Sequence, residues 1–194
     1  LYEIGPHVIF SPPRVWEGLS RSVMVKHLDA SWLKRRLYRW AMPVGYRMAD
    51  FKFAREKAPF GWRLRYSLMY LLIFRALKDR LGFARLRSAS TGGAALGPDV
   101  FRFFHALGVN LKQIYGQTEV AGYSTIHRDG DINFDSVGIP VPAADISISE
   151  PDPGGVWEVI SRGPGLFQGY LNNEEATRGT IIDGWMHTGD AGYF

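Results

Sequence analysis

The sequence contains no cysteine among its 194 residues. This absence excludes disulfide bridges, thiolate nucleophiles and cysteine-based zinc sites from the chemistry of the chain. It is compatible with a reducing compartment, so we expect a cytoplasmic location. Hydrophobic residues make up 46% of the chain and aromatic residues 14%, which is typical of an ordinary folded protein with one large or two small cores.

Long apolar runs are also missing. The longest, YSLMYLLIF at residues 66–74, lies between two arginines and is much shorter than the roughly 20 residues of a membrane-spanning helix. The sequence begins with leucine, shows no signal-peptide pattern and ends within residues that still have the pattern of a folded domain. We therefore expect no transmembrane anchor and a chain that is a fragment of a longer protein.

Each half of the chain is poor in charge of one sign. Residues 1–90 hold 18 Lys and Arg but 6 Asp and Glu, whereas residues 91–194 hold 5 and 13. The basic half favours either a solvated helical face, which most charge runs are, or a surface for an anionic membrane or another polyanion. Binding to a polyanion would weaken steeply with ionic strength, whereas binding of an adenylate would change little.

The first part of the chain predicts a strand, a loop and long helices. The apolar stretch at 7–10 indicates a strand, and Pro13, the second of two prolines after it, suits the first position of a helix. Residues 31–81 are basic and aromatic with helical spacing that ends at Gly82. We expect this region to be helical, with irregular joins.

Residues 83–115 predict a strand-helix-strand unit. The helix begins at Pro98, is followed by Gly108, and carries apolar residues at helical spacing. Strands joined by one helix are expected to be parallel, so the loops TGGAALG and YGQTE that follow them would meet at one edge. Open α/β sheets bind ligands at that edge. The loop SPPRVW would join them if the strand at 7–10 belongs to the same sheet.

After Asp135 the pattern changes to short alternating stretches, and no stretch of helical length remains. Residues 143–149 and 156–161 are expected to pair across the turn PDPGG. The sequence therefore predicts an α/β fold in two parts. Residues 1–136 would form a parallel-sheet portion with flanking helices, of which 31–82 is helical and basic, and residues 137–194 a small antiparallel, β-barrel-like portion.

The stretch YGQTE at 115–119 carries more chemistry than a turn requires. The Tyr115 ring could stack on a base, the Thr118 hydroxyl could bond a phosphate, and the Glu119 carboxylate suits Mg²⁺. Gln117 can donate or accept a hydrogen bond beside them. Each feature alone also has an ordinary explanation as a turn, as packing or as a solvated charge.

Five segments, in order, carry a resemblance to a known family: STGGAAL, IYGQTE, SVGIPVP, VISRGPGLFQGYLNNEEAT and DGWMHTGDAGYF. They resemble the core motifs of the adenylate-forming (AMP-binding) superfamily of acyl-CoA synthetases, luciferases and peptide-synthetase adenylation domains, and cover residues 84–194. The earlier segment GPHVIFSPPRVWEGL is similar to the long-chain fatty acyl-CoA synthetase branch. The resemblance implies a central slice of the N-terminal domain of such an enzyme.

The resemblance also implies a role for each matching residue. The glycine-rich loop would line the adenine and acyl pockets, Tyr115 would stack on adenine, and Thr118 would bond a phosphate. Glu119 would hold Mg²⁺, and Asp190 would bind the ribose hydroxyls. The full set of implied site residues is Gly92, Gly93, Ala94, Tyr115, Gly116, Gln117, Thr118, Glu119 and Asp190.

Two further residues have competing interpretations. Trp16 resembles the tryptophan that closes the fatty-acid tunnel in long-chain members until ATP binds, but beside Val15 and Leu19 it could equally be part of the core. His187 has the side chain of a general base. No acidic partner is evident in the sequence and the family gives it no such role, so we interpret it as structural.

The implied reaction is the ATP-dependent activation of a long-chain fatty acid. The carboxylate attacks the α-phosphate of ATP to give an acyl-adenylate and pyrophosphate, and the thiol of coenzyme A then displaces AMP. The ligands implied are ATP or AMP, Mg²⁺, coenzyme A and a fatty acid, with no nucleic acid. A homodimer is the assembly that the long-chain branch favours.

The sequence lacks the phosphate loop with its lysine and the C-terminal domain with the adenylation lysine that the family carries, so we expect these 194 residues alone to be inactive. Other acyl- or aryl-CoA ligases, such as 4-coumarate-like or medium-chain enzymes, and adenylation domains are alternatives within the superfamily. A basic membrane- or polyanion-binding module is the alternative in a different class. Contact of residues 31–90 with the inner face of a membrane could also coexist with catalysis.

Overall fold

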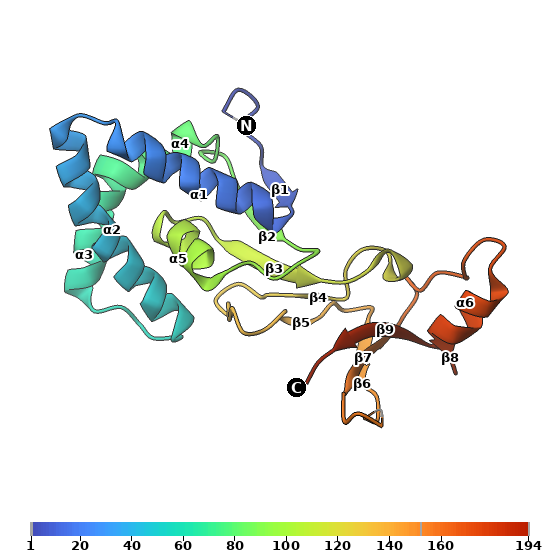
Figure 1. Ribbon diagram of the computed structural model, residues 1–194. Coiled ribbons are helices and arrows are strands. Elements are labelled where there is room, and N and C mark those ends of the chain that lie inside the picture. The colour runs from blue at the N-terminus through green and yellow to red at the C-terminus, as the bar shows by residue number, and fades with distance from the viewer. Residues whose placement is uncertain (1, 152, 194) are drawn as a thin grey trace. The chain divides into compact units, whose positions relative to one another are not determined.

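The computed structural model describes residues 2–151 and 153–193 (Figure 1). The chain forms two compact units. The first unit runs to Gln113 and includes His127–Val137, and the second holds Ile114–Ile126 and the part from Gly138 onward. Strand β3 (Leu111–Tyr115) passes from the first unit into the second. The domain boundary expected after residue 136 stays a prediction, because compact units are not functional domains.

The first unit is built on parallel strands. β1 (Val8–Ser11) pairs with β2 (Ser88–Thr91), and β2 pairs with the first residues of β3. In this register Ile9 lies opposite Ala89, and Ala89 lies opposite Leu111. The predicted parallel strand-helix-strand unit is confirmed, and the strand at the start of the chain joins it in the same direction.

Two helices begin where the sequence places a proline. Helix α1 (Pro13–Leu28) and helix α5 (Pro98–Ala106) both have proline in their first turn, where the missing N–H leaves no intrahelical bond unmade. The apolar face of α5 is buried, and Gly108 follows the helix with φ +78°. Such a left-handed residue is a common helix terminator, which confirms the predicted end.

The basic region is helical, as expected. Helix α2 (Trp32–Phe53) is followed by α3 (Phe60–Met69), a π-helical turn η1 (Tyr70–Phe74) and α4 (Arg75–Arg80). The loop between α2 and α3 and the π turn are the irregular joins. In residues 2–151 and 153–193, no helix is both long and apolar enough to span a membrane.

The second unit is antiparallel. The end of β3 pairs with β4 (Thr125–Ile126), which pairs with β5 (Ile139–Pro140). A four-stranded sheet follows in the order β6-β7-β9-β8, which confirms the pairing expected across the PDPGG turn, although Asp152 of that turn lies outside the described residues. The strands of this sheet are β6 (Asp145–Ile148), β7 (Glu158–Arg162), β8 (Ile181–Ile182) and β9 (Trp185–Ala191).

One element of the second unit contradicts the sequence interpretation. Helix α6 (Glu174–Thr180) lies in the region where no helix was expected. The Asn173 side chain accepts a hydrogen bond from the backbone N–H of Ala176, which satisfies one of the free donors at the start of the helix. Two acidic residues in the first turn also stabilise the helix, because negative charge interacts favourably with the positive, N-terminal end of the helix dipole. The expectation of no helix after Asp135 is therefore wrong.

Candidate functional site

Three predicted site residues meet in the second unit. Tyr115 ends β3, and its hydroxyl donates a hydrogen bond of 2.7 Å to Oδ2 of Asp190 on β9. Nε2 of Gln117 donates to the same oxygen at 3.1 Å and to the backbone oxygen of Thr188 at 2.8 Å. Asp190 lies more than 70 residues after Tyr115 and Gln117 in the sequence, and the three side chains form one cluster.

The environment of Tyr115 keeps its hydroxyl protonated. Burial raises the pKa of Tyr115 to about 12, and the hydrogen bond to Asp190 acts in the same direction. At neutral pH the phenol is a donor and the carboxylate an acceptor. The hydrogen bonds from Tyr115 and Gln117 hold the Asp190 carboxylate in a fixed direction. Because Asp190 is exposed, this carboxylate remains accessible to hydroxyl groups of a ligand.

A bulge in the sheet carries Asp190. Ile160 of β7 lies opposite His187 of β9, so a regular ladder would place Glu158 opposite Gly189. Glu158 instead lies opposite Ala191, two residues further along β9. The extra residues form a bulge in which Gly189 has φ +75°. Bulges re-aim side chains beside functional sites, and this one turns the chain at the predicted ribose-binding residue.

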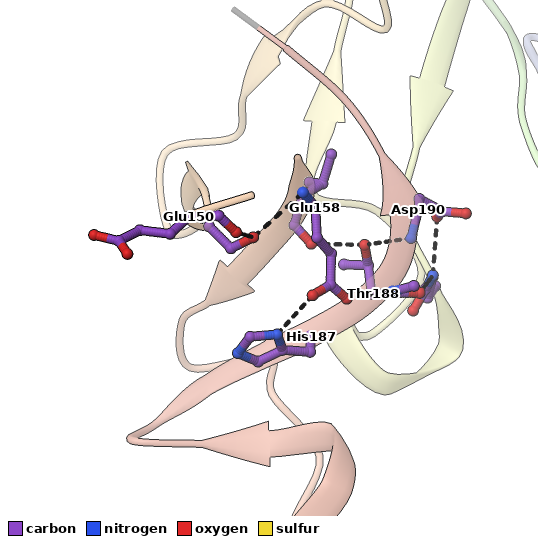
Figure 2. A network of polar contacts seen from close by, with 9 residues as sticks. Glu150, Glu158, His187, Thr188 and Asp190 are labelled. Atoms are coloured by element: carbon purple, nitrogen blue, oxygen red, sulfur yellow. Dashed lines mark hydrogen bonds and ion pairs between the residues drawn. The ribbon is translucent and has the colours of Figure 1, made fainter. Parts of the chain in front are cut away.

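A carboxylate–histidine pair supports the bulge (Figure 2). Oε2 of Glu158 lies 2.7 Å from Nδ1 of His187, and Oε1 accepts a 2.7 Å hydrogen bond from the backbone N–H of Gly189. The Thr188 hydroxyl donates to the backbone oxygen of Val159 at 2.6 Å and accepts from the backbone N–H of Asp190 at 3.1 Å. The expectation that His187 has no acidic partner is therefore wrong, because Glu158, 29 residues earlier, is that partner.

Glu119 and Thr118 lie in a short 3₁₀ turn, η2 (Thr118–Val120), directly after β3. The Tyr170 hydroxyl donates a 2.8 Å hydrogen bond to Oε1 of Glu119, and the backbone oxygen of Glu119 accepts from Phe167 at 2.7 Å. Thr118 is exposed. The loop before α6 thus fixes the direction of the predicted Mg²⁺ ligand.

The donor set around Glu119 fits a nucleotide-bound Mg²⁺. Among the residues that the structure describes, no group of three or more His, Cys, Asp or Glu could hold a metal ion. Mg²⁺ that arrives with a nucleotide is usually held by one or two carboxylates together with phosphate oxygens and water. A single, oriented carboxylate is therefore what such an ion requires from the chain.

Gly116 has a structural reason of its own. A Cβ atom at this position would lie 2.8 Å from the backbone oxygen of Gly122 and 2.8 Å from the backbone nitrogen of Ser124. Only glycine lets the two sides of this hairpin approach so closely, and the backbone N–H of Ser124 donates to the oxygen of Tyr115 at 2.8 Å. This contact fixes the chain direction on either side of the predicted site.

The glycine-rich loop belongs to the first unit, and each unit is described by itself. Gly92 is buried, whereas Gly93 and Ala94 are exposed. Gly93 has φ +83°, which glycine adopts without strain, and open space lies where its Cβ would be. The Ala94 backbone oxygen accepts a 3.0 Å hydrogen bond from Nε2 of Gln113. The adenine- and acyl-binding roles of this loop stay predictions.

Trp16 lies in the core of the first unit. Its side chain is fully buried, with ring centroids 5.0 Å from Phe104 and 5.8 Å from Phe83. Its indole Nε1 has no hydrogen-bond partner within the described part of the chain. The packing interpretation matches this environment, and the gate role stays a prediction.

Sequence reasoning missed three residues of the site. Glu158 is a single acidic residue at the start of an otherwise mostly apolar strand, Thr188 is one of many hydroxyl side chains, and Tyr170 follows a glycine in a polar stretch. Their partners lie 29 to 51 residues away. A spacing pattern cannot show such contacts, and the sequence offered a signal only for Thr188, which lies within the HTGD segment.

The family model for AMP-binding enzymes matches residues 1–171. Long-chain-fatty-acid-CoA ligase ACSBG2 of Xenopus laevis is 30% identical over 193 residues, and ACSBG1 of Rattus norvegicus is also 30% identical over 193 residues. Each alignment covers 99% of this chain and 26% of the relative, so the chain spans about a quarter of the length of the curated relatives it matches.

Solved structures give the same result. An ATP-bound RpMatB-BxBclM chimera is 26% identical with a TM-score of 0.52, over 66% of this chain and 27% of the other. The o-succinylbenzoate-CoA synthetase MenE of Bacillus subtilis, in complex with its acyl-adenylate intermediate, is 25% identical with a TM-score of 0.50, over 57% and 24%. The chain belongs to the AMP-binding enzyme family.

Proposed function

We propose that the protein containing this chain activates a long-chain fatty acid, first to an acyl-adenylate and then to acyl-CoA. The observation that carries the proposal is the cluster of Tyr115, Gln117 and Asp190 within a chain of the AMP-binding family. The long-chain substrate class is supported by relatives that are named as long-chain-fatty-acid-CoA ligases, at 30% identity.

The chemistry requires little from protein bases. A carboxylate is already ionised at neutral pH, so its oxygen can attack the α-phosphorus directly while the bond to pyrophosphate breaks. In the second step the thiol sulfur attacks the acyl carbon, the bond to AMP breaks, and the thiol proton is released. The chain's contribution to both steps would be positioning and charge neutralisation.

Each site residue would then have a defined task. Asp190, held by Tyr115 and Gln117, would accept hydrogen bonds from the ribose hydroxyls, and the Tyr115 ring would pack against the adenine. Thr118 would donate to a phosphate oxygen. Glu119, oriented by the Tyr170 hydroxyl, would hold Mg²⁺, which when bound neutralises phosphate charge.

Pyrophosphate release tests this proposal. The full-length protein would be incubated with ATP and Mg²⁺ and with acids that range from acetate through benzoate to oleate, with and without coenzyme A. The expected result is release that is greatest with the long-chain acids. Release with aromatic or short acids only would assign the enzyme to another branch, and no release with any acid would overturn the proposal.

If release is greatest with long-chain acids, Trp16→Ala would test the predicted gate role of Trp16 by its effect on chain-length preference.

The metal role of Glu119 has a separate test. Glu119→Gln is expected to raise the Mg²⁺ concentration for half-maximal pyrophosphate release by about tenfold or more, because the amide lacks the ligand's charge. Glu150→Gln is the matched control, since Glu150 is an exposed carboxylate of the same unit. An equal Mg²⁺ requirement in wild type and Glu119→Gln would remove Glu119 from the metal site.

We also propose that the helices of the first unit contact an anionic membrane. The continuous helical stretch from α3 to η1 has apolar residues on two faces. One face, with Tyr66, Tyr70 and Phe74, packs against the core. The other leaves a stripe of large apolar side chains exposed at helical spacing, and we call it the α3 stripe: Phe60, Leu64, Leu68, Leu71 and Leu72.

The charge around the α3 stripe matches an anionic surface. Arg63 and Arg65 are exposed and flank it, and residues 32–80 hold 13 Lys and Arg against 3 Asp and Glu. Basic residues near a membrane surface attract anionic lipids, and exposed apolar side chains enter the boundary below the headgroups. An isolated solvated helical face would not need the apolar stripe.

Flotation with lipid vesicles tests membrane contact. The full-length protein is expected to float with phosphatidylglycerol-rich vesicles at low salt but not with phosphatidylcholine vesicles. Arg63→Gln with Arg65→Gln, and Leu64→Gln with Leu68→Gln, should each reduce flotation several-fold, whereas Leu171→Gln, at a 91% exposed leucine of the second unit, should not. No flotation with anionic vesicles, or flotation that the variants leave unchanged, would overturn the proposal. A large fall in melting temperature for Leu64→Gln with Leu68→Gln would assign the stripe to an internal contact instead.

A further inference from the structure

The bulge that carries Asp190 brings a backbone donor, the N–H of Gly189, to a side chain of the neighbouring strand β7. In an antiparallel pair the backbone ladder continues along both strands, and the two extra residues of the bulge interrupt it. The backbone oxygen of Glu158 faces β6, where it accepts a 2.8 Å hydrogen bond from the N–H of Ser149, so it is not available to Gly189. The N–H of Gly189 bonds instead to Oε1 of the Glu158 side chain at 2.7 Å. A side-chain carboxylate of β7 therefore binds the backbone of β9 at the point where β9 turns toward the site.

The same carboxylate is held at its other oxygen. Nδ1 of His187 lies 2.7 Å from Oε2, and because an ionised carboxylate only accepts, the histidine nitrogen must be the donor. Both side chains are about one quarter exposed, at 27% for Glu158 and 28% for His187, so the pair is partly shielded from water. Figure 2 shows Glu158 between His187 and the turn that leads to Asp190, with Glu150 pointing away from this network.

We propose that Glu158 is a positioning residue, which holds the Gly189–Asp190 turn in the shape that binds ribose, and that His187 fixes the direction of its carboxylate. Glu158 touches neither substrate nor reacting atoms in this role. It acts through the backbone of Gly189, while Tyr115 and Gln117 restrain the Asp190 side chain from the other side. The inference rests on the proposed function, because it assumes that Asp190 binds the ribose hydroxyls.

The test compares ATP with 2′,3′-dideoxy-ATP in pyrophosphate release by the full-length protein. Wild type is expected to have a lower KM for ATP than for 2′,3′-dideoxy-ATP. Glu158→Ala should raise the KM for ATP by about tenfold, with a smaller change in kcat and little change in the KM for the acid, because two charge-assisted hydrogen bonds are lost. Its KM values for the two nucleotides should become nearly equal, since a misplaced Asp190 no longer recognises the hydroxyls.

His187 offers a rescue experiment. His187→Ala should show part of the effect of Glu158→Ala, whereas the amide nitrogen of His187→Asn can replace the Nδ1 donor and should restore discrimination between the nucleotides. Glu150→Ala is the matched control and should behave as wild type. Melting temperatures of all variants show whether a loss reflects unfolding. If Glu158→Ala is poorly folded, the comparison of His187→Ala with His187→Asn decides.

The outcomes distinguish the ribose-binding role of Asp190 from the positioning role of Glu158. If wild type does not distinguish ATP from the dideoxy nucleotide, the ribose role of Asp190 is wrong and the proposed function needs revision. If wild type discriminates and folded Glu158→Ala discriminates equally well, the positioning role of Glu158 is wrong while the function stands. Loss of stability with discrimination intact would show a purely structural pair.

Discussion

The His105 ring on α5 is buried between one hydrogen-bond donor and one acceptor of the first unit. Its Nε2 lies 2.9 Å from the Leu111 backbone oxygen, and its Nδ1 lies 3.2 Å from Nζ of Lys52. A lysine ammonium only donates, so Nδ1 must accept and Nε2–H must donate, which requires the neutral ring. Burial, together with the charge of Lys52, lowers the pKa of His105 to about 3.

This low pKa predicts a loss of stability in acid. As pH falls from about 6.5, the unfolded chain binds a proton at His105 and the folded chain does not until about pH 3, so the free energy of unfolding decreases across that window. His105→Gln, which keeps a donor for Leu111, should flatten this dependence in urea unfolding. His7→Gln, at an exposed histidine, is the control and should keep the wild-type slope. An unchanged slope in His105→Gln would contradict the prediction.

The residues of the site differ in how far the sequence could predict them. The family resemblance supplied Tyr115, Gln117, Glu119 and Asp190 because their motifs are local and ordered. The partners that hold them, such as Glu158, come from other strands, and their roles depend on a bulge that no spacing pattern encodes. Single-residue chemistry was thus predictable, but its support was not.

At the scale of elements, the hairpin between β3 and β4 depends on Gly116. Gly116→Ala is expected to destabilise the fold by about 1–3 kcal/mol, because the new methyl group would overlap the backbone of residues 122–124. Gly61→Ala is the matched control. Gly61 is exposed in α3 with open space at its Cβ, so alanine there should stabilise slightly, by about 0.5–1 kcal/mol. Urea unfolding of both variants measures the difference, and equal stabilities would refute the steric explanation.

The elements that the sequence predicted well are those in which several signals agree. Helix α5 has proline at its start, an apolar face and a glycine after its end, and its boundaries were predicted closely. Strands β4 and β5 have two residues each, too few for an alternating pattern, and they were missed. Helix α6 has seven residues and owes its start to the Asn173 cap, a local effect hidden within a polar stretch.

At the scale of the whole molecule, the chain spans about a quarter of its curated relatives. We therefore expect these 194 residues alone to release no pyrophosphate from ATP with Mg²⁺ and a long-chain acid, because the sequence lacks the phosphate loop and the adenylation lysine that the family resemblance implies. The full-length protein assayed in parallel is the positive control. Acyl-adenylate formed by the isolated chain above the background without protein would disprove this expectation.

The α/β character of the chain could be predicted from its sequence, because a helix between two parallel strands gives a long pattern of alternating strand and helix signals. The division of the chain into two units within β3 could not be predicted from the sequence, because the strand is continuous in sequence. Only its pairing changes, from β2 at its first residues to β4 at its last. Pairing partners are a property of the folded chain. The sequence therefore predicted the kinds of structure better than the boundary between them.

The bond between the Gly189 amide and Glu158 has a use in spectroscopy. An amide hydrogen that faces a carboxylate differs in chemical shift from one that faces a carbonyl, and while the bond persists its exchange with deuterium is slowed. Nuclear magnetic resonance of that single glycine would therefore report whether the turn is closed. The measurement needs neither substrate nor turnover, so the shape of the turn can be followed in the resting protein.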